Sequence, residues 1–277
     1  MKIPPELLIN FLSCTLHNNE KLLLTGSDLY CNQCQGVKGI VNKFNISQVN
    51  FLPKEFLSDL GDNSDIKNDK SKWTSWRKEN YQFIQKVSLD PASYIVDIGA
   101  GFGFAHDLFP TAHLISIDFT AFPNTNIVTD LKNDIPLVNN FCDLVMVNNL
   151  LEHLFEPKIV LQNSYRILKS GSSIVITVPF LMRIHQEPHD YLRYTHYYLT
   201  KLLEDIGFRI KLVQSSLDFG TFETLSRQYF QYPIDNGEFM GKLIWQFQKV
   251  VNFLASRLIS KSNRMDFTSG YMILAEK

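Results

Sequence analysis

The segment that decides the fold is Tyr94–Gly103, which reads YIVDIGAGFG, a short apolar run followed by three glycines at alternate positions. Continuous apolar runs of this length are typical of parallel strands that are buried on both faces. Glycines directly after such a strand let the backbone turn tightly and approach a ligand, because no Cβ atoms stand in the way. The segment therefore predicts a buried strand that leads into a nucleotide-cofactor loop.

The spacing of the glycines distinguishes between cofactors. The dinucleotide fingerprint needs a third small residue where this chain has Phe104 or, counted from Gly101, His106. The pattern Asp-x-Gly-x-Gly-x-Gly over residues 97–103 instead resembles motif I of class I methyltransferases that depend on S-adenosylmethionine (SAM). This resemblance implies that Asp97 orients the amino-acid end of SAM, whereas an ordinary strand-to-helix turn is the alternative for a glycine-rich segment taken alone. The loop residues that would pass beside the methionine part of SAM are Gly99, Ala100, Gly101 and Gly103.

A second apolar run, residues 113–118 (HLISID), ends in a carboxylate. Doubly wound folds bind the cofactor ribose at the end of their second strand. We therefore expect Asp118 to bind the two ribose hydroxyls and Phe119 to border the same site, with a solvent-exposed strand end as the alternative. Residues 126–131 (NIVTDL) read as a short third strand. Asp130 and Leu131 in it match the adenine-contacting pair of the methyltransferase family, although Asp is also common in turns.

Two further apolar runs continue the alternation of strands and helices. Residues 142–147 (CDLVMV) read as a fourth strand, and the following segment 148–153 (NNLLEH) resembles the loop after this strand in the type 11 methyltransferase group. That resemblance places Asn148 at the cofactor. A helix that ends at Ser170-Gly171 and a fifth strand over 173–179 follow. The alternation predicts an α/β fold, and the resemblance implies a Rossmann-like seven-stranded methyltransferase sheet with helices on both faces.

The segment after the fifth strand, residues 180–195, concentrates polar chemistry at the edge where open α/β sheets bind ligands. It resembles a His-Asp-Tyr-x-Arg-Tyr-Thr signature of the type 11 group, many members of which belong to glycan and cell-surface biosynthesis. His189 is the first candidate for a general base and His185 the second, because imidazole is partly neutral near pH 7. Arg193 would bind an acidic part of the substrate. A structural loop without proton transfer is the alternative.

The N-terminal region contains two pairs of potential metal ligands. A four-ligand structural zinc site is the natural interpretation, because thiolates and imidazole suit tetrahedral zinc and a module of this size needs a cross-link. The segment also resembles the zinc-ribbon family that includes the activator subunit of tRNA and protein methyltransferases, although the family has Cys-Pro-x-Cys where this chain has Cys-Thr-Leu-His. Reduced thiols without metal are the alternative. The candidate zinc ligands are Cys14, His17, Cys31 and Cys34.

Changes in composition suggest how the chain is divided. We expect a zinc-ribbon-like module over residues 1–52, a polar, flexible linker over 53–72 and the methyltransferase domain over 73–277. Within that domain, an apolar helical insertion spans about 220–262. Apolar residues recur at helical spacing over residues 239–260. This pattern predicts a helix that packs on the sheet or against a second copy, with peripheral membrane contact as the alternative. Three aromatic residues lie at the start of this domain and would form either a lid over the cofactor or part of the core. They are Trp73, Trp76 and Tyr81.

Composition limits the range of functions. A formal net charge of −1 gives no general attraction to phosphate backbones, so nucleic acid is an unlikely but not excluded partner. Four cysteines indicate a reducing compartment, and neither a leader sequence nor a membrane-spanning apolar run is evident. We therefore expect a cytoplasmic protein, with a peripheral position at the inner face of the membrane as the alternative. Oligomeric state is not specified by these features.

Together these features predict an enzyme that transfers a methyl group from SAM to an oxygen or nitrogen atom of a small acceptor, such as a glycan-related or lipid-linked molecule. One alternative is an RNA or protein methyltransferase that uses the ribbon for recognition. Another is an adaptor with a vestigial cofactor pocket. The acidic and glycine residues of the expected cofactor site argue against the adaptor.

Overall fold

The computed structural model describes most of the sheet and its surroundings. Neither the predicted linker 53–72 nor most of the insertion 220–262 falls within its described part. The described residues are 3, 5–17, 20–41, 48–52, 73, 75–216, 243, 246, 247, 250, 265, 266 and 268–277.

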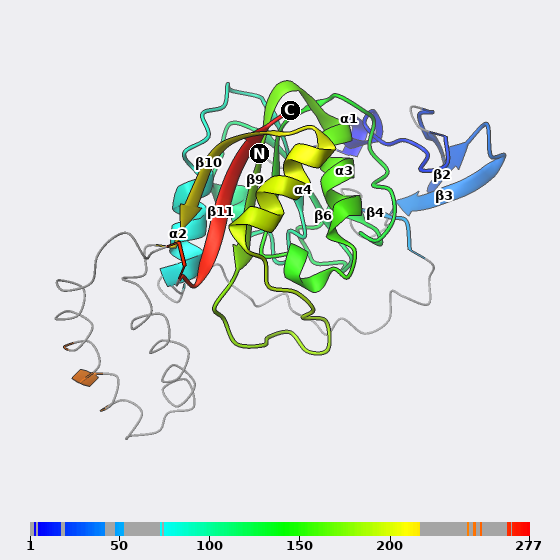
Figure 1. Ribbon diagram of the computed structural model, residues 1–277. Helices are drawn as coiled ribbons and strands as arrows, with labels where there is room; N and C mark the ends of the chain where they lie inside the picture. The colour runs from blue at the N-terminus through cyan, green and yellow to red at the C-terminus, as the bar shows by residue number, and fades with distance from the viewer. Residues whose placement is uncertain are drawn as a thin grey trace.

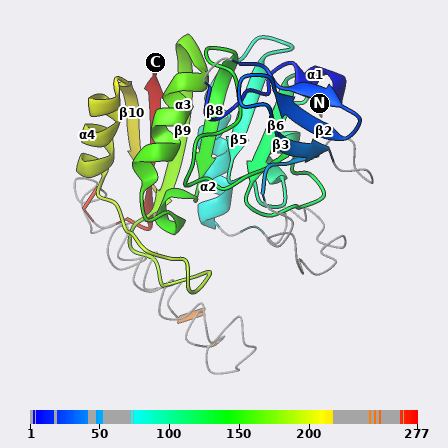
Figure 2. The same cartoon turned by 90° about the vertical axis from the view of Figure 1, so that its right-hand side faces the viewer.

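Five parallel strands form the middle of the sheet, and each is buried for most of its length. Their spatial order is β7-β6-β5-β8-β9, so the chain starts in the centre and moves first to one side and then to the other. Figure 2 shows β6, β5, β8 and β9 side by side. The strands are β5 (Tyr94–Ile98), β6 (His113–Asp118), β7 (Ile127–Val128), β8 (Cys142–Asn148) and β9 (Leu168–Pro179).

Two strands from the end of the described chain extend the sheet beyond β9. β11 (Gly270–Glu276) pairs antiparallel with β9, and β10 (Arg209–Ser215) pairs antiparallel with β11 at the edge. β11 is apolar and buried, as expected for a strand between two others. With the five parallel strands, these two complete the seven-stranded Rossmann-like sheet that the sequence predicted.

Helices cover both faces of this sheet (Figure 1). α3 (Pro157–Ile167) and α4 (His196–Ile206) contact one another and lie on one face, whereas α2 (Ser75–Ile84) lies on the other. Successive side chains of a strand point to opposite faces of the sheet, so the core has two parts. Val96 packs into the cluster beneath α3 and α4, and its neighbour Ile95 packs into the cluster that includes α2. The helices thus leave the carboxyl ends of the central strands open.

Local chemistry sets where α3 and α4 begin and end. Thr195 caps α4 by accepting a hydrogen bond from the backbone N–H of Tyr198, and Gly207 ends it in a left-handed conformation with φ +118°. The predicted end of α3 at Ser170-Gly171 was wrong, because the helix stops at Ile167 and β9 already begins at Leu168. Backbone hydrogen bonds from this early part of β9 to the last residue of the chain explain the longer strand.

Two single-turn 3₁₀ helices follow strands at the open edge of the sheet. η3 (Phe104–Asp107) comes after the glycine loop, and η4 (Leu151–His153) comes after β8. The loop over residues 180–195, which follows β9, lies at the same edge (Figure 1). The three segments that the sequence associated with cofactor and acceptor therefore meet in one region.

The N-terminal region forms a small antiparallel ribbon that is joined to the main sheet. Its last strand pairs in parallel with β7, Val49 lying opposite Ile127, so the complete sheet has 11 strands. β2 and β3 of the ribbon project away from the main sheet (Figure 1). Its elements are α1 (Pro5–Ile9), β1 (Leu23–Thr25), β2 (Asp28–Cys31), β3 (Gly36–Val41) and β4 (Val49–Asn50).

Apolar contacts also attach this region to the main domain. Phe11 packs its ring 4.8 Å from the rings of both Tyr94 and Phe141, and Leu8 and Leu12 are fully buried in the cluster that contains the central strands. The N-terminal module thus shares a continuous core with the methyltransferase-like sheet.

Four residues of the predicted insertion are described, and the three apolar ones, Leu243, Phe247 and Val250, are exposed. Within the described chain, no helix combines the length and apolar character needed to span a membrane. Membrane contact through residues 239–260 stays a prediction, since most of that segment lies outside the described residues.

Candidate active site

A cavity of about 610 Å³ opens at the carboxyl ends of β5, β6 and β8. This is the edge at which parallel α/β sheets bind ligands, because the strand order reverses there. Of the ten residues that the sequence assigned to the cofactor, all but Gly103 line the cavity. These nine are Asp97, Gly99, Ala100, Gly101, Asp118, Phe119, Asp130, Leu131 and Asn148.

The glycine loop has a conformation that requires glycine. Gly99 and Gly101 have φ of +74° and +53°, a region that side chains disfavour. A Cβ atom on Gly99 would lie only 2.8 Å from the Leu150 side chain, whereas a Cβ on Gly101 would meet open space. Gly103, with φ +73°, stands at the start of η3 and turns the chain into it. The loop therefore keeps its backbone close to the cavity.

Two carboxylates face the cavity from the ends of neighbouring strands. Asp118 accepts hydrogen bonds from the backbone N–H groups of Gly101 and Thr120, both at 2.8 Å, so its position is fixed by the loop. Asp97 is 4% exposed, and burial together with the nearby Asp118 raises its pKa to about 7. Burial also raises the pKa of Asp118. A cationic or hydrogen-bond-donating ligand would stabilise the charged form of both carboxylates.

Asn148 lies in a polar network at the end of β8. Its carbonyl oxygen accepts hydrogen bonds from the Thr177 hydroxyl and from the Asn149 amide, and Asn149 in turn accepts a 2.9 Å bond from the indole of Trp76. Tyr81 lines the cavity while being 8% exposed, and its ring packs 4.5 Å from that of Trp73. Trp73, Trp76 and Tyr81 thus belong to the core on this face of the sheet, and Tyr81 also borders the site.

A second cavity, of about 500 Å³, lies between the ribbon and the main domain. It shares Phe119 and Asp130 with the first cavity and includes Lys38 from β3. Phe119 is 47% exposed, which is unusual for so large an apolar side chain. The adenine end proposed by the sequence therefore borders the ribbon.

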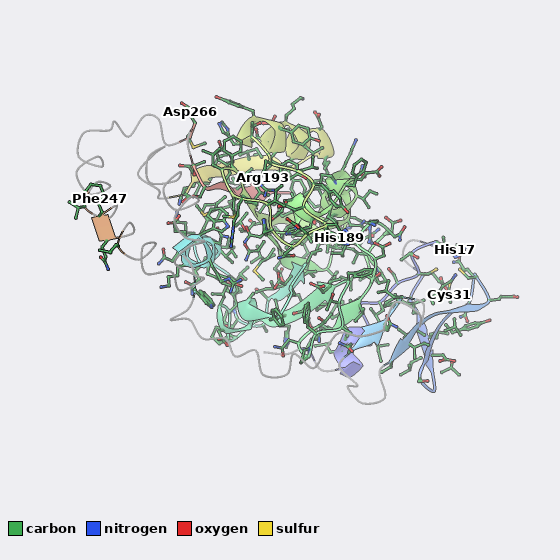
Figure 3. All side chains as sticks on the ribbon, turned by 90° about the horizontal axis from the view of Figure 1, so that it is seen from below. His17, Cys31, His189, Arg193, Phe247 and Asp266 are labelled. Atoms are coloured by element: carbon green, nitrogen blue, oxygen red, sulfur yellow. The ribbon has the colours of Figure 1, made fainter. Side chains whose placement is uncertain are left out.

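The three candidate catalytic residues occupy different positions in the 180–195 loop. His189 lines the cavity, and its Nδ1 lies 2.7 Å from the hydroxyl of Tyr191. His185 and Arg193 are not among the described residues that line it. Arg193 instead holds Asp190 through two hydrogen bonds, and Figure 3 shows its side chain in the same part of the molecule as His189. Arg193 therefore positions another protein group, which differs from the expected direct contact with an acidic substrate.

Two adjacent residues at the site, Glu152 and His153, had no chemistry predicted for them from the sequence. Glu152 is fully buried beneath the loop, and burial raises its pKa to about 8. His153, beside it, lines the cavity. Both were noted only as part of the NNLLEH segment, and the available signal was a carboxylate and an imidazole side by side after a buried strand.

In the ribbon, the four predicted zinc ligands converge; we call them the cysteine cluster (Cys14, His17, Cys31 and Cys34). The sulfur atoms of Cys14 and Cys34 are 3.5 Å apart, and His17 Nδ1 lies 3.1 to 3.9 Å from the three sulfurs. The backbone N–H of Cys34 also points to Cys31 Sγ. Four thiol and imidazole groups at these separations match the donor set and size of a tetrahedral zinc site. Figure 3 shows His17 and Cys31 together in the ribbon, away from His189.

Comparison with known proteins agrees with this architecture. Residues 96–176 match the family described as "Methyltransferase domain". No curated protein matches the sequence. The [4+2]-cyclase SpnF has a similar structure, with a TM-score of 0.50 at 15% identity over 72% of this chain and 80% of that chain. This likeness supports the fold, and it also illustrates that one fold can serve different reactions.

Two other solved structures are similar at lower scores. A SAM-dependent methyltransferase from Archaeoglobus fulgidus has a TM-score of 0.48 at 22% identity, covering 73% of this chain and 94% of that chain. A methyltransferase in complex with the Trm112 methyltransferase activator, from Haloferax volcanii, has a TM-score of 0.49 at 16% identity, covering 73% and 88%. The family match, together with the fold shared with SpnF, indicates a SAM-dependent methyltransferase of the class I fold.

Proposed function

We propose that SAM occupies the 610 Å³ cavity and that its methyl group is transferred to an oxygen or nitrogen atom of a small acceptor. The observation that carries this proposal is the convergence of Asp97, the glycine loop and Asp118 on one cavity. Asp118 would accept hydrogen bonds from the ribose hydroxyls with its remaining lone pairs. Asp97 would face the ammonium group of SAM, which offsets the cost of its buried charge.

Methyl transfer makes few chemical demands on the protein. The acceptor atom forms a bond to the methyl carbon as the carbon–sulfur bond breaks, and the electron pair stays on sulfur, giving S-adenosylhomocysteine. Because the sulfonium already activates the methyl group, the protein mainly aligns the two reactants. A hydroxyl or ammonium acceptor must also lose a proton. His189 would take it at Nε2, with Nδ1 held by the Tyr191 hydroxyl.

The acceptor end of the cavity is polar. Gln186, His189 and Tyr191 line it from the loop, and Arg77 lines it from α2. Such side chains suit an acceptor rich in hydroxyl groups, as a glycan-related molecule is. A lipid-linked acceptor would add contact with the apolar segment 239–260. An RNA acceptor is less favoured, since a net charge of −1 gives no general attraction to a phosphate backbone.

The proposed role of the ribbon is structural, with zinc in the cysteine cluster. β1 is exposed throughout, and the described strands of the ribbon are two to six residues long. Small elements of this kind need an additional cross-link. Zinc would be held by three thiolates and one imidazole, and it would fix the ribbon beside the cavity that contains Phe119.

Calorimetric titration with S-adenosylhomocysteine tests the cofactor site. We expect micromolar binding by the wild-type chain and at least tenfold weaker binding by Asp118→Ala, because charge-assisted hydrogen bonds contribute roughly 1.5–3 kcal/mol each. Asp205→Asn, which changes an exposed carboxylate on α4, is the matched control and should bind normally. Absence of binding by the folded wild-type protein would refute the enzyme and favour the adaptor.

A further inference from the structure

A second group of potential metal ligands lies at the acceptor side of the cavity. We call it the glutamate cluster (Glu152, His153 and His185). Glu152 and His153 come from η4, and His185 comes from the loop after β9. One ligand atom from each of the three lies within 4.8 Å of the others. Nothing in the methyl-transfer reaction proposed above uses this group.

Glu152 has no hydrogen bond that would explain its burial. The side chain is fully buried, and within the described part of the chain neither carboxylate oxygen has a hydrogen-bond partner. The Nε2 atom of His153 is also buried without a partner among these residues. An unsatisfied polar atom costs about 1–3 kcal/mol, and an unpaired charge costs more. The cluster is therefore incomplete as it stands.

The separations within the cluster fit a shared metal ion better than direct hydrogen bonds. Glu152 Oε1 lies 3.6 Å from His153 Nε2 and 3.8 Å from His185 Nε2, which is longer than a normal N–H···O bond. Two ligand atoms bound to one tetrahedral zinc at about 2.1 Å each are roughly 3.4 Å apart. The observed distances are close to that value.

Hydrogen bonds on the outer side of each imidazole turn Nε2 toward Glu152. His153 Nδ1 lies 2.7 Å from the backbone carbonyl of His189, and a carbonyl can only accept, so Nδ1 carries the proton. His185 Nδ1 lies 3.2 Å from a carboxylate oxygen of Asp190 and 3.3 Å from the carbonyl of Arg183, both acceptors. In the neutral imidazole, a proton on Nδ1 leaves Nε2 with a lone pair that faces Glu152. Metal-binding histidines are oriented by such outer partners.

Asp190 is itself held in place. Arg193 donates two hydrogen bonds to its carboxylate, at 2.5 and 2.7 Å, and the backbone N–H of His185 donates another at 2.8 Å. The chain of contacts from Arg193 through Asp190 to His185 is the carboxylate–histidine arrangement that supports metal ligands in proteins. The sequence-predicted Arg193 thereby acquires a role as a positioning residue.

We propose that Glu152, His153 and His185 bind a divalent transition-metal ion of the zinc class. Two imidazoles and one carboxylate form a donor set typical of zinc and of non-haem iron, and three protein ligands leave coordination positions open. The His153 and His185 side chains are 12% and 27% exposed, which allows the ion to enter. Since His153 lines the cavity, the ion would also bind an oxygen of the acceptor. Binding of the acceptor by the ion rests on the proposed function, whereas metal binding itself does not.

The metal content of the purified protein tests the proposal. The protein is stripped with a chelator, reloaded with Zn²⁺, dialysed and analysed by elemental mass spectrometry. We expect Glu152→Gln to retain one equivalent less than the wild type. Glu156→Gln, which alters an exposed carboxylate four residues away, should match the wild type. Equal zinc content in the wild type and in folded Glu152→Gln would overturn the proposal.

Loading with Co²⁺ distinguishes the two clusters and does not depend on a variant. Cobalt bound by cysteine gives strong thiolate charge-transfer absorption, whereas cobalt bound by nitrogen and oxygen gives only weak ligand-field bands. In a Co²⁺ titration of the wild type, the ions that fill the cysteine cluster should give the charge-transfer absorption. We expect a second set of ions to add ligand-field intensity without charge transfer. A titration that ends when the thiolate absorption saturates would refute the site, even if Glu152→Gln fails to fold.

Asp190→Asn tests the outer partner. It leaves all three ligands in place, and we expect it to weaken Zn²⁺ binding at the glutamate cluster by about 10–100-fold. An unchanged affinity would contradict the proposed positioning role. Binding of S-adenosylhomocysteine, measured in parallel, reports on the proposed function separately. The residues assigned to SAM include none of the three metal ligands and not Asp190, and His153 only borders the same cavity.

Discussion

The cysteine cluster and the glutamate cluster bring potential metal ligands within a few ångströms of one another, but they stand in different surroundings. The cysteine cluster joins short strands of a ribbon whose first strand is fully exposed. The glutamate cluster sits against the buried central sheet, beside the cavity. The ribbon has little core of its own, whereas the main domain has an extensive one. A metal in the first cluster should therefore hold structure, and a metal in the second should serve the site.

The largest expected effect comes from breaking the cysteine cluster. Cys31→Ser should release one equivalent of zinc and reduce the local free energy of unfolding of the ribbon by at least about 3 kcal/mol, since structural zinc contributes ~10–16 kcal/mol in isolated zinc-finger peptides. Hydrogen exchange of the amides in β2 and β3 measures this loss.

Cys142→Ser provides the matched control, because Cys142 is buried in the main core and donates its thiol hydrogen to the Ile167 carbonyl. It should retain all the zinc and leave ribbon exchange unchanged. If Cys31→Ser kept its zinc and its protected amides, the structural role of the cysteine cluster would be wrong.

A chelator should remove metal from the two clusters in a fixed order. The glutamate cluster has three protein ligands and a path to solvent, whereas the cysteine cluster has four ligands, three of them thiolates. We expect mild chelation to empty the glutamate cluster at a concentration at least tenfold lower. Metal content measured against chelator concentration, in the wild type and in Glu152→Gln, gives the order. A single release step common to both proteins would contradict it.

Without metal, Glu152→Gln should stabilise the protein. In chelator we expect its free energy of unfolding to rise by about 1–2 kcal/mol, because the amide carries no charge and can donate hydrogen bonds to the two imidazoles. Urea denaturation of both proteins measures the difference. With zinc present, the order should reverse, since only the wild type gains binding energy from the ion. A variant less stable than the wild type in chelator would mean that Glu152 is satisfied without metal.

Asp97 offers a comparison with Glu152, because both carboxylates are buried but Asp97 itself lines the cavity. Its pKa is raised to about 7, and a bound ammonium group would favour the charged form. Binding should therefore release a proton, so that affinity for S-adenosylhomocysteine rises about tenfold from pH 6 to pH 8. Calorimetry at several pH values measures it, and Asp97→Asn should remove most of the dependence. Zinc should leave this profile unchanged.

Much of the fold could be predicted from the sequence because the signals are local. The apolar run before Gly99, the carboxylate at Asp118 and the alternation that follows each depend on neighbouring residues. The helix end at Ser170-Gly171 was misjudged because β9 is extended by pairing with the end of the chain, far away in sequence. The joining of β4 to β7 was likewise not visible, since two-residue strands carry almost no pattern.

The two clusters likewise differ in whether they could be predicted from local sequence. The cysteine cluster was visible because its ligands come in two pairs, each with two residues between them, a spacing that has few other uses. The glutamate cluster was not, because Glu152 and His153 are adjacent while His185 lies beyond a helix and a strand. Arg193 was likewise assigned to a substrate, because its pairing with Asp190 depends on how the loop folds back.

The sequence by itself determined the order of strands and helices, the glycine loop and the carboxylates at the strand ends, because hydrophobic periodicity and backbone freedom act over a few residues. Only the tertiary structure decided which side chains meet. Parallel strands bring their carboxyl ends to one edge, so that Asp97, Asp118 and His189 border a single cavity. The loop after β9 then folds His185 onto Glu152, a contact set by long-range packing rather than by any local pattern.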